Sequence, residues 1–325
     1  MNPPTEPAVI TALPRLNPKG PDDLFICSAS FEERSLSSAA LMDARFIQKY
    51  AIIFNVETPD YKKQVEKNLF RLQTALRGKT TEGIFVISCT RENPVDGIEQ
   101  IAAILTQCKL NTDPGPYVTV DISSFTKIYL LELLHSIDTE LGWPLPRLIH
   151  TTQRYLPTRL TRGIEQITTI PHFYGRPDMH KPNLLVLLLG FEPDRALSIW
   201  QQHNPAKTVA LITNPPRHDS PDYLKYARQN NEELLSKPGV DLRDIPADDP
   251  AGVREVLEEI YEETKGDYNM VVGPFGTKPQ VVGVYLFHRD HPATQVIYSF
   301  PATYTRSYLQ REPGETMLLP PLNRR

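Results

Sequence analysis

The sequence predicts an α/β fold made of two tandem Rossmann-like parallel-sheet domains that form an intrachain pseudo-dimer. Short apolar runs rich in β-branched residues alternate with helical patterns, which is typical of a parallel sheet covered by helices on both faces. One strand–turn–helix unit also occurs twice, at residues 117–136 (YVTVDISSFTKIYLLELLHS) and 268–288 (YNMVVGPFGTKPQVVGVYLFH). A strand–turn–helix unit that returns later in the chain indicates an internal duplication.

The first half contains predicted strands that alternate with helices. A strand at 25–28 leads through a polar loop into a helix that ends near residue 42. A strand at 50–54 precedes a helix opened by Thr58-Pro59-Asp60-Tyr61, where threonine and proline are favoured first residues. Further strands are expected at 83–88, 118–122, 147–152 and 164–170, with helices at 94–106 and after residue 126.

The second half repeats this order. Strands are expected at 184–189, 209–213, 240–245, 270–272, 295–300 and 317–319, and Ser220-Pro221-Asp222-Tyr223 opens a helix as the earlier Thr-Pro-Asp-Tyr segment does. A further helix is expected at 252–264. Matched residues recur at strand ends and helix starts: Phe31-Glu32 with Phe191-Glu192, Arg34 with Arg195, Asn55 with Asn214, Asp60-Tyr61 with Asp222-Tyr223, Asn68 with Asn230, Gly97 with Gly252, and Thr126-Lys127 with Thr277-Lys278.

The repeat sets the expected domain boundaries. Residues 1–22 are predicted to be a loose N-terminal arm, and residues 23–170 the first Rossmann-like domain. Residues 171–182 (PHFYGRPDMHKP), rich in proline and aromatic residues, are predicted to be the linker to a second Rossmann-like domain at 183–325.

Composition narrows the possible functions. A formal charge of −4 argues against a protein that coats DNA or RNA. Three cysteines are too few and too scattered for a disulfide framework, which favours a reducing, cytoplasmic location. Neither a metal-ligand spacing of Cys and His nor a phosphate-loop or dinucleotide fingerprint is present, so no metal or cofactor is expected. No apolar run is long enough to cross a membrane.

Polar residues gather where the predicted strands end. Ligands of open parallel sheets bind beyond the carboxyl ends of the strands, so these residues are the candidates for a ligand site. Threonine hydroxyls, lysine ammonium groups and free N–H groups at helix starts together suit a phosphate or another anion. The predicted ligand-binding residues are Ser30, Glu32, Arg34, Asn55, Ser124, Thr126, Lys127, Glu192, Arg195, Asn214, Gly276, Thr277 and Lys278.

Each candidate also has a structural interpretation. Glu33 lies three residues after Ser30, which is the spacing of a capping box. The two arginines can pair with a neighbouring glutamate, and asparagine at a strand end often makes a turn. Lys127 and Lys278 argue more strongly for a ligand, because the dipole at a helix N-terminus disfavours a cation unless an anion is close.

The segments DISSFTKIYLL (121–131) and GPFGTKPQVVG (273–283) resemble the CARF family, the CRISPR-associated Rossmann-fold sensor domains. The hallmark of that family is a strand, a glycine-rich turn ending in Thr-Lys, and an apolar helix. The chain departs from it where Ser124-Phe125 and Phe275-Gly276 replace the Gly-Gly pair. The resemblance implies a divergent tandem copy in which the Thr-Lys turns line a site for a cyclic oligoadenylate.

Three functions are consistent with these sequence features: a nucleotide sensor, an enzyme and a scaffold. The first is a cytoplasmic nucleotide-sensing or regulatory subunit, CARF-like and belonging to a bacterial anti-phage defence system. It is expected to bind a phosphate-containing ligand between the two homologous halves and to act through a separate effector protein. The alternative is a nucleotide-processing enzyme of phosphodiesterase or N-glycosidase type, in which Asp121 and Ser123 would be catalytic. Because Val272 stands in the place of Asp121 in the second copy, such chemistry would be confined to the first. The third function is a scaffold partner in a defence complex.

Overall fold

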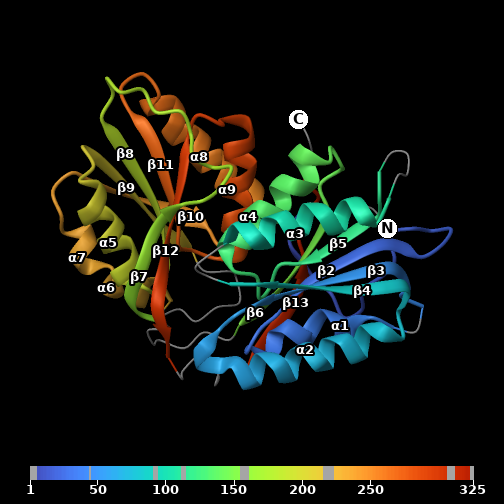
Figure 1. Cartoon of the computed structure of the whole chain (residues 1–325). Coiled ribbons are helices and arrows are strands. Elements are labelled where there is room, and N and C mark those ends of the chain that lie inside the picture. Colours follow the sequence, from blue (N-terminus) through green and yellow to red (C-terminus); the bar gives the residue numbers. More distant parts are fainter. Residues whose placement is uncertain are drawn as a thin grey trace. The chain divides into compact units, whose positions relative to one another are not determined.

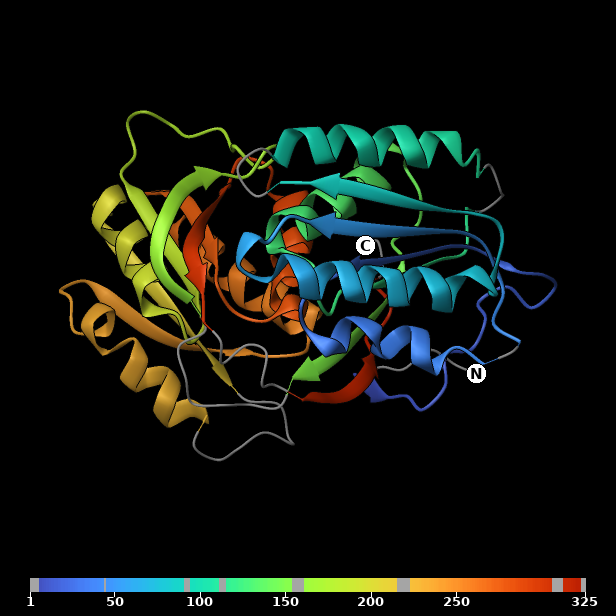
Figure 2. The same ribbon diagram turned by 60° about the horizontal axis from the view of Figure 1, so that its bottom comes forward.

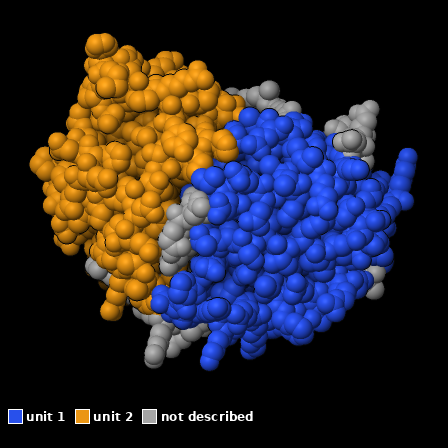
Figure 3. Space-filling view, viewed as in Figure 1, with its two compact units in different colours: residues 1–154, 311–325 blue, residues 155–310 orange. Residues whose placement is uncertain are grey.

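The computed structural model describes residues 6–43, 45–90, 94–110, 115–153, 161–214, 223–305 and 312–322. The chain divides into two compact units, unit 1 with residues 1–154 and 311–325 and unit 2 with residues 155–310 (Figure 3). Each unit is a sheet of mostly parallel strands flanked by helices, which confirms the predicted α/β fold. The duplication and the pseudo-dimer stay predictions.

Unit 1 is built on a seven-stranded sheet with the order β1-β13-β6-β5-β2-β3-β4. The five strands from β6 to β4 in that order are parallel, whereas β13 runs antiparallel to β6 and β1 antiparallel to β13. The strands are β1 (Ala8–Val9), β2 (Asp22–Ala29), β3 (Gln48–Val56), β4 (Thr80–Cys89), β5 (Val118–Asp121), β6 (Arg147–Gln153) and β13 (Pro313–Leu318).

Helices cover both faces of this sheet. The 3-10 turn η1 (Glu33–Leu36), α1 (Ser37–Leu41) and α2 (Lys62–Arg77) lie on one face, and α3 (Pro94–Gln107) and α4 (Lys127–His135) lie on the other (Figures 1 and 2). Phe25 and Ile53 of the sheet pack with Leu72 of α2 in a fully buried cluster. Every residue of α4 from 127 to 134 is buried, as its apolar sequence predicts.

Unit 2 has a six-stranded sheet with the order β10-β9-β8-β11-β12-β7, in which only β7 is antiparallel to its neighbour. Helices α5, α6 and α7 lie on one face and α8 and α9 on the other (Figure 1). The elements are β7 (Thr161–Thr169), β8 (Asn183–Leu189), α5 (Pro193–His203), β9 (Lys207–Asn214), α6 (Tyr223–Asn230), α7 (Glu232–Leu235), β10 (Val240–Pro246), α8 (Pro250–Thr264), β11 (Asn269–Pro274), α9 (Lys278–Asp290) and β12 (Gln295–Tyr304).

The two sheets share one strand order. In unit 1 the parallel strands lie in the spatial order β4-β3-β2-β5-β6, and in unit 2 in the order β10-β9-β8-β11-β12. If the parallel strands of each unit are numbered along the chain, both orders are 3-2-1-4-5. The loops after the first and fourth strands, which carry most of the predicted site, therefore leave adjacent strands at the same edge of each sheet.

The units differ from the predicted domains at both ends. Strand β7, expected in the first domain, pairs with β12 of unit 2, and β13, expected in the second domain, pairs with β6 of unit 1. The predicted N-terminal arm is also wrong from residue 8 onward, because β1 pairs with β13 and Leu13 is buried. Within the predicted linker, Phe173 is fully buried and its ring lies against Tyr285 of unit 2.

Some local predictions need correction as well. The Thr58 side chain does not cap a helix but donates to the carbonyl of Val56 at 3.2 Å, and a 3-10 turn, η2 (Pro59–Tyr61), precedes α2. The matching start at Ser220 to Asp222 lies outside the described residues. Among the residues that the structure describes, no helix has the length and hydropathy needed to cross a membrane.

Candidate functional site

The loop after β2 is held in place by Ser30, by Ser124 of a second loop and by the buried Asn68. The Asn68 side-chain amide of α2 donates to the carbonyl of Ser30 at 2.8 Å, and the Ser30 hydroxyl accepts the N–H of Glu32 at 3.3 Å. The Ser124 hydroxyl, from the loop after β5, donates to the carbonyl of Ser28 at 2.7 Å. Ser30 and Ser124 therefore fix these two loops to each other and to α2.

Glu32 and Arg34 form an ion pair at the same edge. The Arg34 Nε lies 2.9 Å from the Glu32 Oε2, and both side chains are largely buried. Arg34 also donates through Nη1 to the carbonyl of Thr151 on β6 at 3.4 Å. The predicted capping role of Glu33 is wrong, because this exposed carboxylate pairs with Arg71 of α2 at 2.9 Å.

Asp121 and Ser123 are buried and bonded within the fold. The Asp121 carboxylate accepts from the Ser123 N–H at 2.9 Å and from the hydroxyls of Ser123 and Ser38. The Ser123 hydroxyl in turn accepts the Thr151 N–H at 2.7 Å. Burial raises the pKa of Asp121, while these hydrogen bonds and the charge of Arg34 act to lower it.

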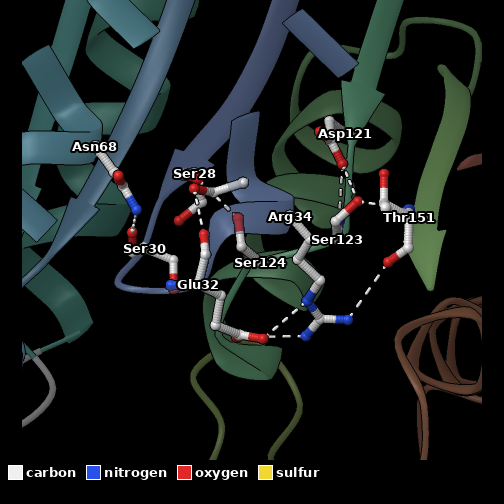
Figure 4. A network of polar contacts seen from close by, with 10 residues as sticks. Ser28, Ser30, Glu32, Arg34, Asn68, Asp121, Ser123, Ser124 and Thr151 are labelled. Carbon is white, nitrogen blue, oxygen red and sulfur yellow. Dashed lines mark hydrogen bonds and ion pairs between the residues drawn. The ribbon is translucent and has the colours of Figure 1, made fainter. Parts of the chain in front are cut away.

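These contacts form one polar network from four elements (Figure 4). It joins the end of β5, helix α1, strand β6 at Thr151 and the start of η1, where Glu32 and Arg34 lie. Ser123 is fully buried and Asp121 is 2% exposed, so neither side chain faces a substrate in this arrangement. The geometry favours a structural role for both residues over the catalytic role considered for them.

The Thr126-Lys127 turn opens α4 without a side-chain cap. The Thr126 side chain makes no cap hydrogen bond, and its oxygen is buried with no hydrogen-bond partner among the described residues. Lys127 begins the helix and is 6% exposed. Three residues after Thr126, the Tyr129 hydroxyl donates to the carbonyl of Thr90 at 2.7 Å instead of capping the helix. Thr126 thus gives no side-chain cap to the first backbone N–H groups of α4.

The matching turn of unit 2 is closed by its own glutamine. Thr277 and Gln280 form a capping box at the start of α9, and the Thr277 hydroxyl also donates to the carbonyl of Ala247. The Gln280 amide nitrogen donates to the carbonyl of Pro246 at 2.8 Å and to the Thr213 hydroxyl at 3.1 Å. A Cβ at Gly276 would lie 1.6 Å from the Gln280 Oε1, so glycine is needed for the glutamine to cover this turn.

Arg195 of unit 2 lies at the position that corresponds to Arg34 in unit 1, and its side chain is more deeply buried. It pairs with Glu192 at 3.0 Å and donates through Nε to the carbonyl of Ser299 on β12 at 2.8 Å. Its guanidinium lies 5.0 Å from the ring centre of Phe275 and 4.6 Å from that of Tyr298. In both units, the matched arginine thus joins the first loop to the fifth parallel strand.

The matched asparagines of the two units differ in burial and in hydrogen bonding. Asn55 is the last residue but one of β3 and is half-buried, whereas Asn214 is the last residue of β9 and is exposed. The residue equivalent to Asn68 is Asn231 and not the predicted Asn230, since the Asn231 amide donates to the carbonyl of Gly190 at 2.9 Å. Sequence matching missed Asn231 because two asparagines stand side by side and only one is buried.

Comparisons with known proteins place the chain in no family. No protein-family model matches it, and no curated protein matches it. Can2 from Sulfobacillus thermosulfidooxidans, solved with cyclic tetra-adenylate, is a weak structural neighbour with 19% identity and a TM-score of 0.30. The match covers 36% of this chain, and the chain spans only 31% of the length of Can2.

A second solved structure matches over more of the chain but less closely. An N-terminal ketoreductase from a macrolactin assembly line has 11% identity and a TM-score of 0.26, with 90% of this chain and 72% of that chain covered. Likenesses this weak carry no argument about function, so the functional argument rests on the residues described above.

Proposed function

We propose that this protein is a CARF-like nucleotide-sensing or regulatory protein of bacterial anti-phage defence that binds a phosphate-containing ligand at the start of α4. The observation that carries the proposal is the Thr126-Lys127 turn, in which a lysine begins an uncapped helix at the carboxyl edge of a parallel sheet. The ligand class would be a linear or cyclic nucleotide, and the response would pass to a separate effector protein.

The physical argument rests on charge at the helix start. The aligned peptide dipoles give a helix N-terminus a partial positive charge, which a lysine ammonium increases unfavourably. A phosphate reverses this balance, because its oxygens accept from backbone N–H groups and pair with the lysine. The buried Thr126 hydroxyl oxygen is a further group that gains a partner when a ligand oxygen arrives.

The second turn is less suited to the same ligand. The Gln280 side chain already accepts the Thr277 N–H at 2.8 Å and lies over Gly276, where an anion would approach the backbone. We therefore infer one ligand position at the start of α4, with Lys278 as the matched position that does not bind it.

The test is mass spectrometry of nucleotides released from the heat-denatured protein, together with a thermal-shift panel of linear and cyclic nucleotides. For the ligand found, Lys127→Ala should weaken binding by about 1.5–3 kcal/mol, or about 10- to 150-fold, the scale of a charged hydrogen bond. Lys278→Ala is the control and should leave the affinity within about threefold, a difference of less than one kcal/mol.

Other outcomes separate the alternatives. Equal losses in the two lysine variants would place a ligand at both turns, and no loss in either would remove the turns from the site. If the nucleotide is converted to product over time, the protein is an enzyme. Asp121→Asn would then show whether the buried carboxylate takes part, since an unchanged rate removes it from the chemistry.

A further inference from the structure

The strands that follow β6 and β12 in the chain do not pair with them. Strand β7 follows β6 after residues 154–160 but pairs antiparallel with β12 of unit 2. Strand β13 follows β12 after residues 305–312 and pairs antiparallel with β6 of unit 1. Each half of the sequence therefore gives its last strand to the sheet of the other half.

Strand β13 completes unit 1 with backbone and side-chain contacts. Its Thr316, Met317 and Leu318 lie opposite residues 151, 150 and 149 of β6, and the Leu319 N–H donates to the carbonyl of Leu148 at 3.0 Å. Met317 and Leu319 are buried, and the Thr316 hydroxyl lies 2.8 Å from that of Thr151. Without β13, the edge of β6 would expose unpaired backbone groups beside buried apolar side chains.

The N-terminal strand depends on the same element. Ala8 and Val9 of β1 pair with Leu318 and Met317 of β13, and the Ile10 N–H donates to the carbonyl of Thr316 at 2.9 Å. Strand β13 is thus inserted between β6 and β1, with hydrogen-bonded neighbours on both sides. Its position links both ends of the chain to one sheet.

The two acceptor edges are equivalent. Strands β6 and β12 are each the fifth parallel strand of their sheet, and each receives an antiparallel strand on the same side in the strand order. Seven pairs of residues join β7 to β12, from Ile297 with Thr169 to Tyr304 with Thr161. Because β13 pairs with the half of the chain that precedes it across an intervening segment, the same strand could pair with the β6 edge of a second copy of the chain.

We propose that the edge of β6 is a strand-acceptor surface and that its partner in trans is the C-terminal strand of a second copy of this chain. The contacts in an exchanged dimer would be those that β13 makes within one chain, so the exchange needs no new surface. It requires β13 to leave β6 first, and the buried Met317 and Leu319 make that step slow.

The test uses the full-length chain with a protease recognition sequence inserted between residues 305 and 312. After folding and cleavage, the C-terminal piece should remain bound to the rest of the chain on gel filtration. A fluorescent peptide of residues 312–322 should then enter over hours, saturate at one peptide per chain, and be displaced by excess unlabelled peptide. A Met317→Asp peptide should be taken up at least tenfold less.

Exchange between intact copies is measured separately. Two uncut chains with different tags are mixed at high concentration in mild denaturant, which is then removed, and co-purification of the tags at the dimer mass is the expected result. A cleaved C-terminal piece that leaves the folded chain, with no uptake of the labelled peptide, would overturn the acceptor surface. Normal peptide uptake without any mixed-tag dimer would overturn the exchange between copies.

Discussion

At the scale of single residues, the least expected feature is a carboxylic acid inside the apolar helix α4. Glu132 is fully buried, and burial, together with the charge of Glu140, raises its pKa to about 9. In the unfolded chain the pKa of a glutamate is close to its ordinary value of 4.5. At pH values between this pKa and the folded-state pKa of about 9, the folded protein therefore binds one more proton than the unfolded chain. The native protein therefore loses stability as the pH rises through this window.

This difference predicts the effect of Glu132→Gln. The glutamine cannot titrate, so the free energy of unfolding of the wild type should fall relative to that of the variant as the pH rises above about 4.5. The relative loss should reach about 3 kcal/mol at pH 7, from 1.36 kcal/mol per pH unit, and should level off above the folded pKa of about 9. Urea unfolding of both proteins between pH 4 and pH 9 measures it.

The control is Glu140→Gln, which removes the neighbouring charge but keeps the buried acid. Because burial is the larger cause of the raised pKa, this variant should retain most of the pH dependence of the wild type. If the free energy of unfolding changes with pH in the same way for the wild type and for Glu132→Gln between pH 4 and pH 9, Glu132 has an ordinary pKa in the folded protein.

At the scale of elements, two helices with the same Thr-Lys start are capped in different ways. Gln280 closes the start of α9, whereas Tyr129 stands at the corresponding position of α4 and bonds elsewhere. Thr277→Val should therefore lower the free energy of unfolding by about 1 kcal/mol or more, because the variant loses both the helix N-cap and the hydrogen bond to the carbonyl of Ala247. Thr126→Val should change it by less than half of that amount, because no cap bond is lost.

Denaturant unfolding of the two matched variants measures this difference. Equal losses of stability would mean that Thr126 caps α4 as well, and the argument for an open helix start would then fail.

The elements themselves were largely predictable from the sequence. Apolar runs located the strands and the buried helix α4 because burial on both faces leaves a local signal. The candidate site residues were chosen because polar side chains collect at strand ends, but the contacts of these residues depend on neighbours distant in sequence, such as Asn68 for Ser30. The difference between the two Thr-Lys turns depends on one residue, Gln280 or Tyr129, which repeat matching passed over.

At the scale of the whole molecule, unit 2 is one continuous segment, whereas unit 1 is formed by two segments of the chain. The predicted domain boundaries missed this arrangement because an apolar strand pattern indicates burial but does not name the strand that pairs with it. Strands β7 and β13 each lie close in sequence to a strand with which they do not pair.

This organisation predicts which fragments fold. Residues 155–310 contain every strand of their sheet and should give a cooperative thermal transition when expressed alone. Residues 1–154 lack β13, leave β6 at an open edge, and should aggregate or unfold without cooperativity. Circular dichroism melting of both fragments measures this, and adding residues 311–325 to the second fragment through a flexible linker should restore its transition. A cooperative transition in residues 1–154 alone would contradict the dependence on β13.

The pairing of β1 with β13 also has a consequence for chain order. Since Ala8 lies opposite Leu318, the segments near the two ends of the chain are neighbours, so a short linker can join them. With its two ends joined by such a linker, the chain could be given new ends between residues 154 and 155. The permuted chain would then contain residues 155–310, residues 311–325, the linker and residues 1–154, in that order. In that permuted gene, both units would be continuous, and the nested arrangement would become two consecutive domains without the loss of a single strand pairing.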